Sequence, residues 1–113
     1  PDMATITGSI STGQIAKKAV STGSEAVSLE FESQRQKQLT VAVYNKGGSA
    51  LSGLEITRVL QDGSTSTESS HGALAASAGV TFVFSYNVPK FQVNYTAGGA
   101  ATVLVEVDNG GVS

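Results

Sequence analysis

Residues 39–56, with the sequence LTVAVYNKGGSALSGLEI, constrain the fold more than any other segment of this chain. Apolar side chains occupy every second position from Leu39 to Val43, and the same alternation resumes after Asn45 and a pair of glycines. A period of two turns one side chain toward a dry core and the next toward water. Asn and Gly are residues that tight turns favour. The segment therefore predicts two strands of an antiparallel β-sandwich joined by a turn, with Gly47 or Gly48 at positive φ.

The same period recurs over most of the chain after residue 25. Its apolar positions are Val27, Leu29 and Phe31, then Val80, Phe82, Phe84 and Tyr86, then Phe91, Val93 and Tyr95, and finally Val103, Val105 and Val107. Turn residues such as Asp62-Gly63 and Gly98-Gly99 separate the runs, and residues 62–70 are expected to be a loop before a weak strand at 71–74. No run has the helical period that a βαβ crossover needs. We therefore predict an all-β fold, an antiparallel β-sandwich of about seven strands in Greek-key order.

Residues 1–24 differ from the rest because they are polar and hold few apolar side chains. We expect a polar N-terminal arm or edge strand over 1–24 and the sandwich domain over 25–113. Residues 12–20 leave an alternative open, a short helical turn capped by Thr12 and ended by Gly23. The Thr and Ile residues of the arm suit the addition of a strand to a sheet edge, in the same chain or in a neighbour.

Composition narrows the classes of partner. Charged residues make up only 14% of the 113 residues, and this is typical of a surface that neighbours cover. The net charge of −2, with scattered basic residues, argues against nucleic acid as a partner. No apolar run is long enough for a transmembrane helix, so we expect no membrane partner. The absence of cysteine leaves stability to packing and to subunit contacts, and leaves the redox compartment open. The Pro-Asp-Met start indicates synthesis in a host cytoplasm, unless a leader was removed.

Candidate catalytic and metal-binding residues are few. His71 is the single histidine, and we expect it to be a solvated loop residue. Glu30 and Glu32 share one face of a strand at a spacing that glycoside hydrolases use, but that face is wet, so a solubilising role is expected. Oxygen ligands at Glu106, Asp108 and Asn109 leave a calcium site conceivable. We predict a protein that is not an enzyme, with no catalytic, cofactor or metal residues, and with Tyr44 pointing outward.

Two stretches carry a resemblance to known domains. The pattern of residues 39–56, apolar-x-apolar-x-Asn-x-Gly followed by Leu-x-x-Leu-x-Ile, resembles the Asn-x-Gly turn of the immunoglobulin-like domains called CARDB. Residues 74–82 and 91–103 are similar to the second half of those domains and to compact versions among bacteriophage structural proteins. The resemblance covers residues 26–107. It implies an immunoglobulin-like antiparallel β-sandwich.

The resemblance and the composition together favour a virion protein. The expected function is that of a bacteriophage capsid decoration or cement protein, which binds the major capsid protein or another virion protein and lies on the capsid surface as a homo-oligomer, here guessed to be a trimer. Residues expected to bind the partner are Thr5, Ile6, Thr7, Ile10 and Tyr44. The alternative is a carbohydrate- or receptor-binding module of a phage tail, a fibre or a bacterial surface protein.

Overall fold

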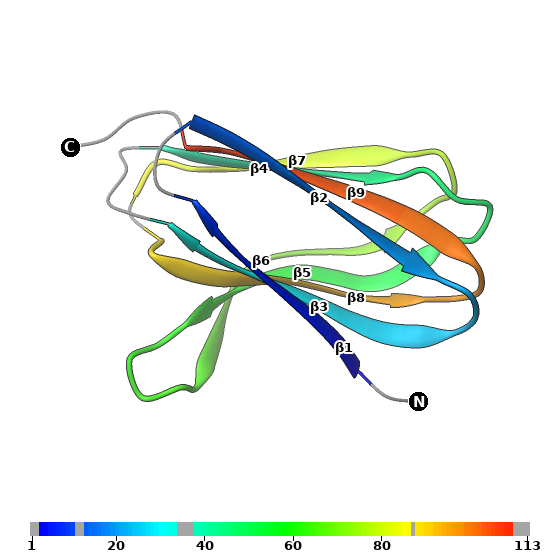
Figure 1. The fold of residues 1–113 in the computed structure, drawn as a ribbon, viewed down its shortest axis with the longest axis horizontal. Coiled ribbons are helices and arrows are strands. Elements are labelled where there is room, and N and C mark those ends of the chain that lie inside the picture. Colours follow the sequence, from blue (N-terminus) through cyan, green and yellow to red (C-terminus); the bar gives the residue numbers. More distant parts are fainter. Residues whose placement is uncertain (1–2, 11–12, 34–37, 87, 110–113) are drawn as a thin grey trace.

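The computed structural model describes residues 3–10, 13–33, 38–86 and 88–109, and they form a two-layered β-sandwich (Figure 1). The described strands are β1 (Met3–Ile10), β2 (Gly13–Ser21), β3 (Glu25–Ser33), β4 (Leu39–Asn45), β5 (Leu51–Val59), β6 (Thr65–Leu74), β7 (Gly79–Phe84), β8 (Lys90–Ala97) and β9 (Ala101–Asn109). One sheet has five strands in the order β1-β3-β8-β5-β6, and the other has four in the order β2-β9-β4-β7. No helix that could cross a membrane occurs in the described ranges.

The predicted all-β, immunoglobulin-like β-sandwich is confirmed. Val41, Val43, Phe82, Phe84 and Val105 all point inward, as alternation predicted, and none is more than 7% exposed. Phe31 and Phe91 stack at the centre of the core, with ring centroids 5.2 Å apart, and both are fully buried. Side chains from the two sheets meet in a single cluster, which supplies the apolar burial that stabilises a chain without disulfides.

The strand number differs from the expected seven because residues 3–21 form two further strands. β1 pairs parallel with β3, and β2 pairs antiparallel with β9, so this segment adds one edge strand to each sheet of its own chain. The alternative of a helical turn is wrong, because residues 13–21 are extended; Thr12 lies outside the described residues. Ala19 is 5% exposed and Val20 is 63% exposed, so the alternation is real but rests on few apolar side chains.

The expected loop at residues 62–70 is shorter than predicted. β6 begins at Thr65, and its hairpin with β5 projects beyond the rest of the five-stranded sheet (Figure 1). Asp62 closes the tip by accepting a hydrogen bond from the Ser64 amide at 2.9 Å. This bond and a second from the Ser64 hydroxyl, the larger cause, lower the pKa of Asp62. Ser and Thr signal loops, yet alternating Thr also favours strands, and pairing with β5 decides the outcome.

The Asn45 turn is built differently from the prediction. Neither Gly47 nor Gly48 has a positive φ; among the glycines that the structure describes, Gly53, Gly63 and Gly72 do. Gly47 is needed instead because its Cα lies against β9, where an added Cβ would stand 2.7 Å from the Ala101 Cα atom. The Lys46 amide also donates to the Thr102 carbonyl at 2.8 Å, which holds the turn on β9.

Tyr95 provides a test of the core. Its side chain is 3% exposed, and its hydroxyl has no hydrogen-bond partner among the described residues. Because an unpaired buried hydroxyl costs free energy, Tyr95→Phe is expected to raise the free energy of unfolding by about 1 kcal/mol in urea denaturation at pH 7. Tyr44→Phe, at an exposed position, is the control and should change it by less than about 0.5 kcal/mol.

The same variant has a pH signature. Burial, reinforced by the charge of Glu25, raises the pKa of Tyr95 to about 12 from 10.0. The unfolded chain therefore loses this proton near pH 10 while the folded chain keeps it to about pH 12. The resulting stability is complete below pH 10 and is lost as the pH rises toward 12. Melting curves of Tyr95→Phe should show a smaller alkaline decline than the wild type, and an identical decline would contradict this assignment.

Candidate binding surface

The outer face of the four-stranded sheet holds Tyr44, the one partner-binding candidate whose side chain the structure describes. The registers place Tyr44 between Leu104 of β9 and Gly79 of β7, in a row across the sheet. Its ring leans over Gly79, where an added Cβ would stand 2.8 Å from the Tyr44 Cδ1 atom. The side chain is 38% exposed, so the outward orientation predicted for Tyr44 is confirmed.

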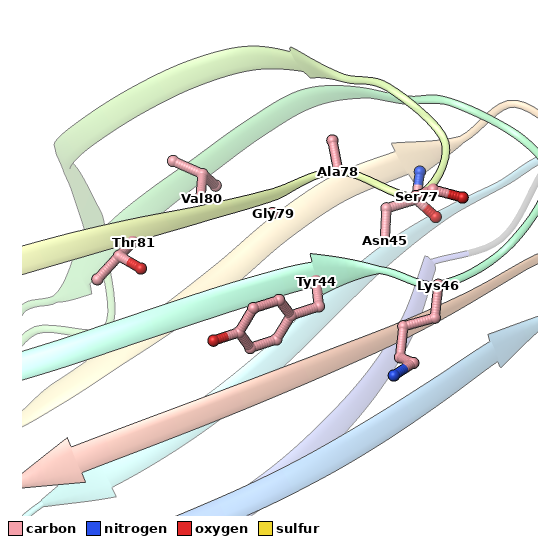
Figure 2. A pocket seen from close by; sticks show the side chains of 8 residues that line it. All are labelled: Tyr44, Asn45, Lys46, Ser77, Ala78, Gly79, Val80 and Thr81. Carbon is pink, nitrogen blue, oxygen red and sulfur yellow. The ribbon is translucent and has the colours of Figure 1, made fainter.

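A hollow of about 510 Å³ opens beside this ring (Figure 2). Its lining residues are Tyr44, Asn45, Lys46, Ser77, Ala78, Gly79, Val80 and Thr81, all shown in Figure 2. The side chains of Tyr44 and Lys46 extend from the same side of the chain, whereas Asn45 turns toward the segment that precedes β7. The hollow thus has an aromatic wall, a small-residue floor at Gly79 and a cation at its rim.

Asn45 shapes the hollow from within the fold. The side chain is 1% exposed, and its Nδ2 atom donates to the carbonyl oxygens of Ser49 at 2.8 Å, Ala75 at 3.2 Å and Leu74 at 3.3 Å. Its Oδ1 atom accepts from the Gly47 amide at 3.2 Å, and its own amide donates to the Ala78 carbonyl at 2.8 Å. These bonds tie the turn after β4 to the turn before β7, so both walls of the hollow are fixed.

A second hollow lies on the other side of the same turn. It measures about 500 Å³ and is lined by Val20, Ser21, Thr22, Gly47, Gly48, Ala100, Ala101 and Thr102. Val20 is 63% exposed beside it. We call the two hollows, with Tyr44 and Val20, the turn-end surface. Lys46 is the charged residue that lines it, and such a weakly charged, partly apolar surface suits contact with another protein.

The other candidates for partner binding lie on β1. Their backbone is paired with β3, with Thr5 opposite Ser28 and Ile6 opposite Leu29, so this strand docks in its own chain. The side chains of Thr5, Ile6, Thr7 and Ile10 lie outside what the structure describes. The sequence did not indicate that Val20 is exposed, because an isolated valine in a polar segment carries no such signal until its strand is placed.

Glu30 and Glu32 are not brought together as a catalytic pair. Glu30 accepts a hydrogen bond from the Gln92 Nε2 atom at 3.0 Å and lies 3.6 Å from the Lys90 Nζ atom, so both its carboxylate oxygens are engaged. Glu32 faces Lys90 across the β3–β8 pair. His71 is exposed, as expected, but it lies in strand β6 and not in a loop, with its ring edge-on to Phe82 at 6.4 Å. Among the described side chains, no three His, Asp or Glu residues gather as a metal site would require.

Glu30 belongs to a polar ladder on the outer face of the five-stranded sheet. Its links run from Ser28 to Asn94 at 2.7 Å, from Asn94 to Thr57 at 3.0 Å, from Thr57 to Gln92 at 3.3 Å and from Gln92 to Glu30. Ser28 and Thr57 are 2% and 4% exposed, so their hydroxyls depend on these partners. The ladder joins β3, β8 and β5 and stabilises the sheet.

Comparison with known proteins supports the fold of this chain but assigns the chain to no family. No protein-family model matches the sequence, and no curated protein matches it. Solved structures do match. They include the pre-peptidase C-terminal domain of a collagenase from Bacillus anthracis, at 15% identity, 90% coverage of this chain, 94% of that chain and a TM-score of 0.55. The SPBc2 prophage-derived protein YomS matches at 14% identity, with 85% and 95% coverage and a TM-score of 0.53. The PBSX exported protein XepA matches at 14% identity, with 88% and 38% coverage and a TM-score of 0.53.

Proposed function

We propose that this chain is a non-enzymatic bacteriophage virion protein that decorates the capsid surface, binding the major capsid protein or another virion protein. The turn-end surface carries the proposal. Tyr44 and Val20 stand exposed beside two hollows on a rigid sheet, and an exposed aromatic next to a hollow is how protein interfaces anchor a partner. The prophage origin stated in the name of YomS supports this class of protein, and the Asn45 turn supports a CARDB-like relationship.

A structural role also accounts for the acidic residues. Glu30 is occupied by Lys90 and Gln92 within the polar ladder, and this pairing fixes the carboxylate in place. A general acid would instead need an environment that holds its proton near neutral pH. The chain is therefore proposed to act by binding, as a homo-oligomer, and not by catalysis.

Co-sedimentation with capsids that lack this protein tests the proposal. We expect the wild type to pellet with the capsids and Tyr44→Ala to bind at least about tenfold more weakly, because loss of one anchoring aromatic typically costs more than 1 kcal/mol. Tyr86→Ala is the matched control, since Tyr86 is 47% exposed but lies beyond the opposite end of β7. A wild type that stays in the supernatant, or a Tyr44→Ala variant that binds like the wild type, would refute this role for the turn-end surface.

The polar ladder favours a second candidate, a carbohydrate- or receptor-binding module. Amide and hydroxyl groups of Asn94, Gln92 and Thr57 are the chemistry that binds sugar hydroxyl groups, and they line one sheet face. Their mutual hydrogen bonds would have to be exchanged for bonds to a sugar, and such an exchange gains little. Binding of the chain to glycans or to host cells, weakened by Asn94→Ala and absent for capsids, would favour this candidate.

A further inference from the structure

β7 is an edge strand without the features that protect sheet edges. It ends the four-stranded sheet, and its sequence GVTFVF has no charged residue and no proline. The opposite edge of the same sheet, β2, carries Lys17 and Lys18, and β6 of the other sheet carries Glu68 and departs from regular pairing with β5. Charges, prolines and bulges are the usual means by which an edge strand avoids pairing with another chain.

The hydrogen-bonding pattern of β7 can be worked out from its partner strand. The Asn45 amide donates to the Ala78 carbonyl, which makes Asn45 and Ala78 a hydrogen-bonded pair in the β4–β7 register. Such pairs alternate along an antiparallel ladder. Val80, Phe82 and Phe84 therefore bond to β4, and the N–H and C=O groups of the residues between them point to the open edge. Those residues are Gly79, Thr81 and Val83.

The side chains of these three residues share the outer face. Val83 is 57% exposed, Thr81 is exposed, and Gly79, which has no side chain, lies under the Tyr44 ring. A two-fold axis at Thr81 would place each Thr81 opposite the other and each Val83 opposite the Gly79 of the second copy. Every outward N–H and C=O of the three residues then finds a partner. Each valine also stands opposite a glycine and can pack against the Tyr44 ring that covers it, a favourable pairing across strands.

We propose that two copies of this chain pair through β7, antiparallel about Thr81, to form one continuous sheet of both four-stranded layers. The occupant of the edge is a second copy because the edge is self-complementary. The two-fold axis that pairs the backbone groups also places each valine opposite a glycine. β7 carries no charged residue, so the pairing brings no two like charges of this strand together. An isologous contact closes with two copies. It thus gives a pair in place of the trimer expected from the sequence, and it does not depend on capsid binding.

Sedimentation equilibrium of the purified chain, without capsids, tests the pairing. We expect the wild type to reach twice the 11.5 kDa mass of the chain at micromolar to millimolar concentration. Val83→Lys, which puts a long charged side chain opposite the second copy's Gly79, should weaken pairing at least about 100-fold. Val20→Lys is the matched control, an equally exposed valine on the opposite edge strand, and should pair like the wild type. Circular dichroism and melting temperature check that each variant is folded.

A cross-linking variant tests the axis itself. Paired residues of this type have Cα atoms about 5.5 Å apart, within the range that a disulfide spans. Because the chain has no cysteine, Thr81→Cys should oxidise to one covalent dimer, whereas Val20→Cys should stay monomeric under the same mild oxidation. A wild type that is monomeric throughout the concentration range, or a Val83→Lys variant that pairs like the wild type, overturns the proposal. Equal cross-linking of both cysteine variants rejects the axis at Thr81.

Discussion

Asn45→Ala is expected to lower the free energy of unfolding by about 3 kcal/mol, because a buried side chain loses several hydrogen bonds at about 1 kcal/mol each. The side chain is 1% exposed and bonds to backbone groups of the turn after β4 and of the turn before β7. Alanine leaves the Leu74 carbonyl, whose bond to Asn45 is buried, without this donor. Urea denaturation of the wild type and the variant measures the difference.

Asn94→Ala is the control for this prediction. Asn94 also bonds to the hydroxyls of Ser28 and Thr57, but Asn94 itself is partly exposed, so water can enter the space that the amide leaves and bond to these groups in its place. We expect its loss to cost less than about 1.5 kcal/mol. Asn45→Asp should be at least as damaging as Asn45→Ala, because a carboxylate would face the carbonyl oxygens of Ser49 and Ala75. If Asn45→Ala were no worse than Asn94→Ala, the asparagine would not be what joins the two turns.

The core and the sheet class were predictable because alternation acts locally. A strand with Leu39, Val41 and Val43 on one face has one way to bury them, and all three are fully buried. The outward position of Tyr44 follows from the same period. These predictions needed no knowledge of which strands pair.

The strands β1 and β2 could not be predicted from the local sequence pattern. Their strand conformation depends on pairing with β3 and β9, and a polar segment gives no hydrophobic period from which to predict it. The parallel pairing of β1 with β3 is a second obstacle, since a sequence of short strands and turns suggests antiparallel neighbours. Tertiary contacts, and not propensity, decide these elements.

The candidate site was predictable only in part, because it too depends on contacts between segments that are distant in the sequence. Tyr44 was identified from its own strand, but the hollow beside it exists because residues 75–78 dock on Asn45 from a distant part of the chain. Gly79 gained its importance from the Tyr44 ring that covers it, a contact across two strands. Glycine in a strand signals close approach of another group, without saying which one.

The proposed pairing and the proposed capsid contact would reinforce each other. Antiparallel pairing about Thr81 keeps the outer faces of both four-stranded sheets on one side, so a pair would present two copies of the turn-end surface in the same direction. Two linked contacts bind a repeating lattice more tightly than one, because the second forms at high effective concentration. Val83→Lys should therefore weaken capsid binding as well, while leaving each single contact intact.

Gly47→Ala is expected to destabilise the fold strongly, whereas Gly48→Ala, one residue away, is expected to be nearly neutral. A Cβ at Gly47 would stand 2.7 Å from both the Ala101 Cα and the Thr102 N atoms, and these backbone atoms cannot swing aside as a flexible side chain can. A Cβ at Gly48 meets nothing within 4 Å. Neither glycine has a positive φ, so backbone strain does not contribute to the difference in stability between the two variants.

Forcing β9 away from the turn would also strain the hydrogen bond from the Lys46 amide to the Thr102 carbonyl. We expect Gly47→Ala to lose about 2–3 kcal/mol of stability in urea denaturation, in the range that overpacking of a tight contact costs. Gly48→Ala should change it by less than about 1 kcal/mol, since alanine meets no neighbour there and its restriction of the unfolded chain favours folding. Equal losses at the two positions would mean that the turn requires glycine for its backbone conformation, as the sequence first suggested, and not for its approach to β9.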